Sequence, residues 1–130
     1  MSASNSNQRH ILVVEDDLDL AFMYKDALEE RGYSVSTAPN GLLALKCILH
    51  RQVDAVLCDL KMPEMHGDKF FEAVERLKPH LVRRFIFVTG MANDPQFRSF
   101  IERMASQTLL KPASIEQVLE AVEKTLAAGA

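Results

Sequence analysis

The sequence lacks several features that define protein classes on their own. It has no tryptophan and only two cysteines, Cys47 and Cys58, among 130 residues, which excludes a disulfide scaffold. It has no basic excess, because 15 Lys and Arg stand against 18 Asp and Glu for a net charge of −3, so no nucleic-acid-binding surface is expected. No apolar run approaches the roughly 20 residues that span a bilayer. The polar segment 1–8 lacks the apolar stretch of a secretory signal, so we expect a cytoplasmic protein without a membrane anchor.

What the sequence does contain is ordinary for one globular domain. Hydrophobic residues make up 48% and charged residues 25%, as in a typical folded chain. The length also matches the commonest domain size of roughly 100–150 residues. We predict a flexible polar lead at residues 1–8, one domain at 9–127 and a short tail at 128–130. A single small domain leaves no room for a separate substrate or output domain, so one compact site or surface must carry the function.

Strand-like and helical patterns alternate along the chain. The segments that predict strands are 11–14, 33–38, 55–58, 85–88 and 108–110. A helical apolar period follows each of them, introduced by the cap signals Asp17, Asn40, Gly67-Asp68, Asp94-Pro95 and Ser114–Gln117. This period assigns Leu49 and Leu77, among others, to the core. Strict alternation with short connections predicts an α/β fold: a doubly wound, five-stranded parallel sheet with helices on both faces.

A restricted set of polar residues follows the predicted strands. In chain order they are Glu15-Asp16-Asp17, Asp59, Thr89 and Lys111. Ligands in such folds bind beyond the carboxyl ends of the strands, so these side chains are expected to converge. Clustered carboxylates repel one another unless a cation neutralises them, and Mg²⁺ takes one or two carboxylates together with waters and a phosphate. With an ammonium and a hydroxyl beside the metal, the cluster predicts a cradle for a phosphoryl group with Asp59 as nucleophile.

The motifs around these residues resemble the response-regulator receiver domain of bacterial two-component signalling. The matching stretches are 11–17, 57–67, 88–90 and 110–112. Within 57–67, the Asp-x-x-Met-Pro-x-x-x-Gly pattern is highly specific when it occurs together with the other three stretches. The resemblance covers about residues 9 to 127 and implies a flavodoxin-like sheet with strand order 2-1-3-4-5. It places the domain in a phosphorelay, and Gly90 together with Leu-Leu-Lys-Pro at 109–112 resembles the subtype attached to hybrid histidine kinases.

The resemblance implies a metal site and a phosphoacceptor. Asp59 would take a phosphoryl group from the phosphohistidine of a histidine kinase or histidine phosphotransfer protein. Mg²⁺, or Mn²⁺ in its place, would bind Asp16, Asp59 and the backbone carbonyl of Lys61 directly. Glu15 would act through a metal-bound water, and Asp17 would serve as the helix cap. The domain would catalyse its own phosphorylation and dephosphorylation and change its surface for an unknown downstream protein.

The remaining matched residues concern the phosphoryl oxygens and the response to them. Thr89 and Lys111 would bind phosphoryl oxygens, and the Lys111–Pro112 bond would be cis. Receivers often carry Tyr or Phe three residues before the lysine as a rotating switch, but this chain has Thr108. This departure leaves phosphorylation intact and removes the aromatic toggle. In receivers the toggle helps phosphorylation to change the surface formed by the fourth helix, fifth strand and fifth helix. A homodimer of this chain would form through that surface.

Other functions fit parts of the pattern. A haloacid-dehalogenase-type phosphatase needs Asp-x-Asp, but Lys61 stands where its second acid should be. A flavodoxin-like cofactor binder needs a Ser/Thr/Gly-rich first loop, where this chain has three acids. His66 is interpreted as a plain loop residue, and Cys58 as a small buried hydrophobe. We therefore predict a phosphoacceptor receiver domain, with a non-phosphorylated receiver-like interaction module as the alternative.

Overall fold

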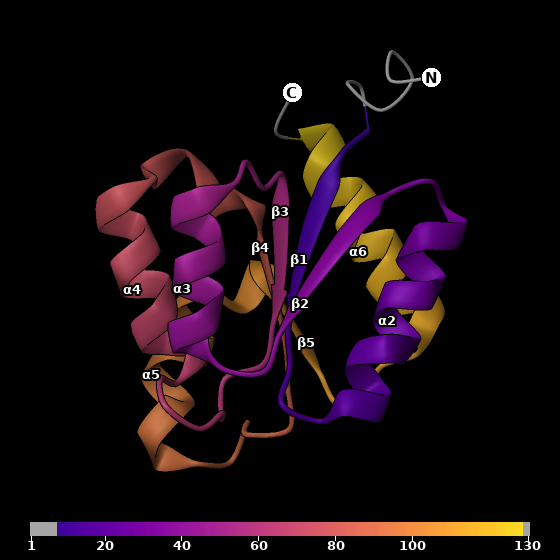
Figure 1. The fold of residues 1–130 in the computed structure, drawn as a ribbon. Coiled ribbons are helices and arrows are strands. Elements are labelled where there is room, and N and C mark those ends of the chain that lie inside the picture. Colours follow the sequence, from indigo (N-terminus) through magenta and orange to yellow (C-terminus); the bar gives the residue numbers. More distant parts are fainter. Residues whose placement is uncertain (1–7, 129–130) are drawn as a thin grey trace.

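The computed structural model describes residues 8–128 and contains one parallel sheet (Figure 1). Its strands are β1 (His10–Val14), β2 (Ser34–Ala38), β3 (Ala55–Cys58), β4 (Phe85–Thr89) and β5 (Thr108–Leu110). Their order across the sheet is β2-β1-β3-β4-β5, and every pairing is parallel. The predicted fold class and strand order are therefore confirmed. The predicted lead and tail fall largely outside the described residues, although Ala128 lies in the last helix.

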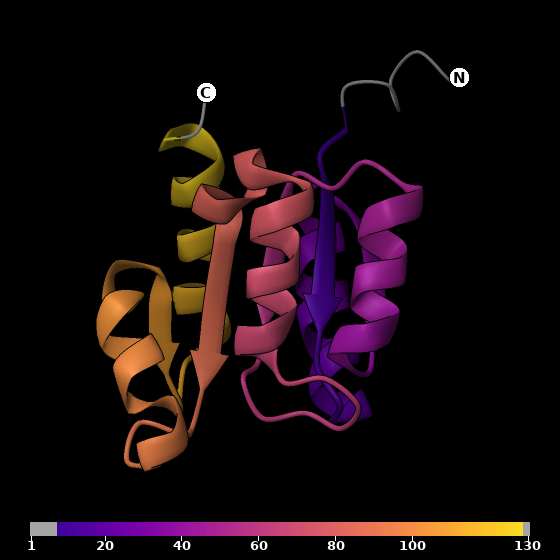
Figure 2. The same ribbon diagram turned by 90° about the vertical axis from the view of Figure 1, so that its left-hand side faces the viewer.

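Helices cover both faces of the sheet (Figures 1 and 2). One face carries α2 (Leu18–Glu30) and α6 (Ile115–Ala128). The other carries α3 (Gly41–His50), α4 (Gly67–Leu77) and α5 (Pro95–Arg103). Two short 3₁₀ helices that the sequence did not predict, η1 (Pro79–Arg84) and η2 (Ala105–Gln107), lead into β4 and β5. Within residues 8–128, none of these helices combines the length and apolar composition needed to span a bilayer.

Four of the five predicted helix caps form as local hydrogen bonds, whereas α4 begins at Gly67 with no side-chain capping bond. Side-chain oxygens of Asp17, Asn40 and Asp94 each accept a bond from a backbone N–H in the first turn of the following helix. At the start of α6, Ser114 and Gln117 exchange two bonds, of 2.8 and 3.1 Å, as a capping box does. These four signals fix where α2, α3, α5 and α6 start, and so fix the length of the loop between each of these helices and the strand before it.

The core has an aromatic half and an aliphatic half. On the side of α3, α4 and α5, the buried rings Phe70, Phe71, Phe85, Phe87 and Phe100 pack with centroids 5.0 to 5.7 Å apart. Two predicted core positions are wrong, because Leu49 and Leu77 are each 52% exposed. α3 carries leucines around most of its circumference, but its buried residues are only Gly41, Ala44 and Ile48. Leu77 is the last residue of α4.

A buried histidine joins the first strand to the edge strand. His10 is 4% exposed, and its Nδ1 and Nε2 lie 2.6 and 2.8 Å from the hydroxyls of Ser34 and Ser36. Burial lowers the pKa of His10, the charge of Arg51 lowers it further, and Asp54 partly opposes both. The folded protein therefore holds this imidazole neutral below the pH at which a free histidine gains its proton.

This network predicts a stability loss in mild acid. As pH falls below about 6.5, the unfolded chain binds a proton at His10 before the folded protein does, so the free energy of unfolding falls, by at most about 1.4 kcal/mol per pH unit. Urea unfolding at pH 7.5 and pH 5.5 should show a smaller loss in His10→Gln than in the wild type. His80→Gln, at an exposed position in η1, is the matched control. Equal pH dependence of all three proteins would contradict the prediction.

Candidate functional site

The register of the sheet brings the predicted site residues to one edge. Val14 pairs with Cys58 and Thr89 pairs with Leu110, so Glu15, Asp59 and Lys111 are the next residues along their strands. Their backbone N–H groups continue the ladders: Asp59 donates to Val14 (3.0 Å) and Lys111 to Thr89 (2.9 Å). In Figure 2 this edge is where the arrowheads of the strands point. The expected convergence at the carboxyl ends is thus built by strand register alone.

Three carboxylates form the centre of the site. Glu15, Asp16 and Asp59 each offer an oxygen within 4.8 Å of the others. The Nζ of Lys111 lies 3.1 Å from Asp59 Oδ2 and 3.6 Å from Glu15 Oε1. Glu15 is buried, Asp59 is mostly covered and Asp16 is exposed. One ammonium therefore faces three acids in a cluster that opens to solvent on the Asp16 side.

The cluster has three carboxylates against one ammonium, and the pKa values of Glu15 and Lys111 are shifted within it. Burial raises the pKa of Glu15 to about 7; the N–H of Asp17 opposes this, Asp59 adds to it, and Lys111 opposes it again. Burial acts to lower the pKa of Lys111, but the charge and hydrogen bond of Asp59 and the charge of Glu15 outweigh it and raise that pKa. The lysine thus stays charged and does not neutralise the acids fully. All-oxygen donors with surplus negative charge fit a hard divalent cation such as Mg²⁺.

Asp59 is fixed by its own loop. Its Oδ1 accepts a 2.7 Å bond from the N–H of Leu60, while Oδ2 faces Lys111. The preceding residue, Cys58, points to the aromatic half of the core and is 1% exposed, as predicted. Gly67 presses against this turn from the start of α4, where a Cβ would lie 2.2 Å from the Asp59 carbonyl oxygen. Sequence reasoning missed this contact; the signal was a glycine in a first helical turn, where glycine is a poor helix former.

The two other residues predicted to contact a phosphoryl group are Thr89, at the end of β4, and Lys111, directly after β5. Thr89 ends β4, is fully buried and accepts a 3.0 Å bond at Oγ1 from the N–H of Met91. Lys111 is followed by a cis peptide bond to Pro112, as predicted. Lys61 lies two residues beyond Asp59 with its side chain exposed. Thr108, in the place of the aromatic toggle, donates its hydroxyl to the carbonyl of Met104 at 2.7 Å.

The charged groups of the site also act on one core tyrosine, Tyr24. Tyr24 in α2 is 4% exposed and was predicted only as a core residue. Burial raises the pKa of its phenol; the charge of Lys111 lowers it, and the charges of Glu15 and Asp59 raise it. A tyrosine among the aliphatic core positions of that helix is the signal that could have drawn attention to it.

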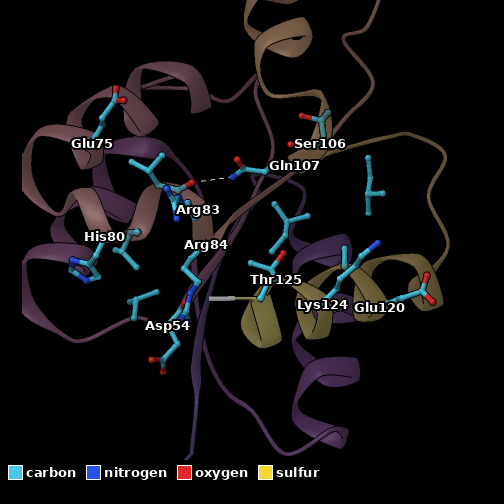
Figure 3. A pocket seen from close by; sticks show the side chains of 18 of the residues that line it. Asp54, Glu75, His80, Arg83, Arg84, Ser106, Gln107, Glu120, Lys124 and Thr125 are labelled. Atoms are coloured by element: carbon cyan, nitrogen blue, oxygen red, sulfur yellow. Dashed lines mark hydrogen bonds between the residues drawn. The ribbon is translucent and has the colours of Figure 1, made fainter. Parts of the chain in front are cut away.

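A surface depression of about 1240 Å³ lies at the opposite, amino-terminal end of the sheet (Figure 3). His80, Arg83 and Arg84 of η1 line one side, and Glu120 and Lys124 of α6 line the other. The polar groups that bridge it are already bonded within the fold: the amide of Gln107 donates to the carbonyls of Val82 and Phe85. It contains none of the predicted site residues and does not form a second converging site.

Known proteins are similar to this chain in sequence. The family model described as the response regulator receiver domain matches residues 11–123. The sensor kinase CckA of Brucella abortus is 33% identical over 123 residues, which are 93% of this chain and 13% of that protein. The chemotaxis protein CheY of Bacillus subtilis is 31% identical over 117 residues, 89% of this chain and 96% of that protein.

Solved structures of response regulator proteins have a similar fold. A CheY-like receiver domain protein of Methanospirillum hungatei has a TM-score of 0.84 at 27% identity, covering 95% of this chain and 97% of that one. The response regulator TrrA of Thermotoga maritima, in complex with Mg²⁺-BeF, has a TM-score of 0.78 at 29% identity, covering 92% and 100%. The strand-end residues, the sheet order and the matched family model lead to one conclusion: this chain belongs to the response regulator receiver domains of two-component signalling.

Proposed function

We propose that Asp59 is the phosphoacceptor of a domain spanning residues 9–127, acting with Mg²⁺. The observation that carries this proposal is the geometry at the sheet edge: three carboxylate oxygens within 4.8 Å, with the Lys111 ammonium 3.1 Å from Asp59. Asp16, Asp59 and the Lys61 carbonyl would hold the metal, and Glu15 would bind one of its waters. Mn²⁺, another hard cation, would substitute. The Mg²⁺-BeF complex of TrrA supports the same assignment.

The residues of this chain would then divide the work of phosphoryl transfer. A carboxylate oxygen of Asp59 attacks phosphorus; the donor's P–N bond breaks, and the imidazole keeps the electron pair and takes up a proton. Lys111 holds one phosphoryl oxygen as a compact charge. Thr89 accepts its bond from Met91 through a lone pair, so its hydroxyl proton can be donated to another oxygen. When bound, Mg²⁺ neutralises charge on the transferred group.

The phosphodonor would be a histidine kinase or a histidine phosphotransfer protein in the cytoplasm. The exposed apolar residues Leu18, Phe22 and Met23 on α2, next to the acidic edge, support an approach from that side. A homodimer through α5, β5 and α6 would bury Leu110, which is 52% exposed. The downstream protein would read the phosphorylated surface.

Intact-mass measurement tests the phosphoacceptor. Incubated with acetyl phosphate and Mg²⁺, the protein should gain the mass of one phosphoryl group, because acetate is a good leaving group and needs no partner protein. Addition of EDTA should suppress the gain, and Mn²⁺ should restore it. Absence of any gain with acetyl phosphate and with a phosphorylated histidine phosphotransfer protein would favour the non-phosphorylated interaction module.

A further inference from the structure

His66 lies where the loop that follows Asp59 meets α5. Its ring centroid is 5.4 Å from that of the fully buried Phe97, at an interplanar angle of 57°. Its Nδ1 is 3.4 Å from the side-chain nitrogen of Gln96. Although His66 occupies the N-cap of α4, its side chain makes no capping bond there. The ring therefore serves a contact between two elements rather than its own helix. We call the contact of His66 with Gln96 and Phe97 the His66 junction.

The loop between Asp59 and His66 is firmly held. Gly67 donates to the carbonyl of Leu60 at 2.7 Å and packs directly on the Asp59 carbonyl. Met65 is held at its carbonyl by the N–H of Gly41, at 3.1 Å. Because Gly67 joins the end of the loop to the backbone of Asp59 and Leu60, we expect a shift of the Asp59 backbone to reach the adjacent His66.

A second path reaches the same point from Thr89. The Thr89 hydroxyl binds the N–H of Met91, and the Met91 carbonyl accepts from Asp94 at 3.0 Å. Asp94 then caps α5, accepting from Gln96 at 2.9 Å and, through its carbonyl, from Phe97 at 3.0 Å. The loops that carry Asp59 and Thr89 thus end on opposite sides of the His66 junction. Any change in their separation alters that contact.

The usual position of an aromatic switch cannot serve this purpose here. Thr108 has no ring to rotate, and its hydroxyl is bonded to Met104. We propose that the His66 junction, rather than the β5 residue, transmits phosphorylation of Asp59 to α5. This inference rests on the proposed phosphoacceptor role of Asp59. It assigns the transmission of the signal from that site to the ring of His66, in the loop after β3.

Backbone amide shifts test the proposal, with Mg²⁺ and beryllofluoride as the probe. In the wild type, amides near Asp59 and Thr89 and amides of α5 should both shift. In His66→Ala the site shifts should persist while the α5 shifts fall by about twofold or more, because the coupling contact is lost. His66→Phe keeps a ring against Phe97 and should restore the α5 response. His80→Ala removes an exposed histidine elsewhere and should match the wild type.

The outcomes separate this inference from the proposed function. Full α5 shifts in His66→Ala, with normal site shifts, would overturn the role of the junction and leave the phosphoacceptor intact. An α5 response lost in both His66→Ala and His66→Phe would also overturn the ring contact as the coupling element. Absence of site shifts in the wild type would instead contradict the role of Asp59. Thermal unfolding of each variant confirms that all four proteins are folded.

Discussion

Asp59→Asn should lose phosphorylation by acetyl phosphate, with a rate reduced by at least about a thousandfold, the scale on which removal of a covalent nucleophile acts. The amide is a far weaker nucleophile than the carboxylate. It also removes the charge that faces the Lys111 ammonium at 3.1 Å and leaves two carboxylates in place of three in the cluster. The intact-mass gain expected for the wild type should be absent under the same conditions.

Asp17→Asn is the matched control for this variant. Asp17 also carries a negative charge at the end of β1, but it caps α2 and is not part of the carboxylate trio. Asparagine caps a helix as well as aspartate does, so this change removes one nearby charge without removing the nucleophile or the cap. Asp17→Asn should still gain one phosphoryl group. Phosphorylation of Asp59→Asn at the wild-type rate would show that another residue accepts the group.

Gly67→Ala should destabilise the fold and impair the site together. An added Cβ would lie 2.2 Å from the Asp59 carbonyl oxygen and 3.0 Å from the Leu60 Cα, both backbone atoms that cannot swing away. Alanine favours a helix over glycine by about 1 kcal/mol, but overpacking against backbone costs more. We expect a net loss of about 2 kcal/mol in the free energy of unfolding. Phosphorylation should also slow, because the displaced atoms belong to Asp59.

Gly90→Ala provides the comparison in the same site. A Cβ there would meet only the Lys111 Cβ and Cδ, at 4.0 Å, which is ordinary van der Waals contact. Its unfolding free energy should stay within about 0.5 kcal/mol of the wild type. Urea unfolding of the two variants measures the difference directly. Equal stability of both would show that the start of α4 can move away from Asp59 at little cost.

The predicted site followed from a rule about parallel sheets. Glu15, Asp59 and Lys111 each stand directly after an apolar run, and such residues meet at one edge when the strands are parallel. No such rule exists for contacts between loops. The approach of Gly67 to Asp59 and the contact of His66 with Phe97 depend on how separate segments settle against each other. They could not be predicted from spacing.

The same contrast holds for the helices. Their starts were predictable because the caps Asp17, Asn40 and Asp94 bond to backbone within one turn of chain. Their buried faces were harder to predict, because Leu49 and Leu77 fit the apolar period but face solvent. The apolar period identifies which residues lie on one face of a helix. Whether that face is buried depends on which other element packs against it.

The five strand–helix units, four of the helix caps, the parallel sheet and the chemical groups at the carboxyl ends of its strands can be predicted from the sequence. These are encoded in local spacing and short-range hydrogen bonding. Three features came from the folded structure: the distances between Glu15, Asp59 and Lys111, the fit of Gly67 on Asp59, and the contact of His66 with Phe97. These depend on residues from different elements and loops, whose positions are fixed by the packing of the whole domain.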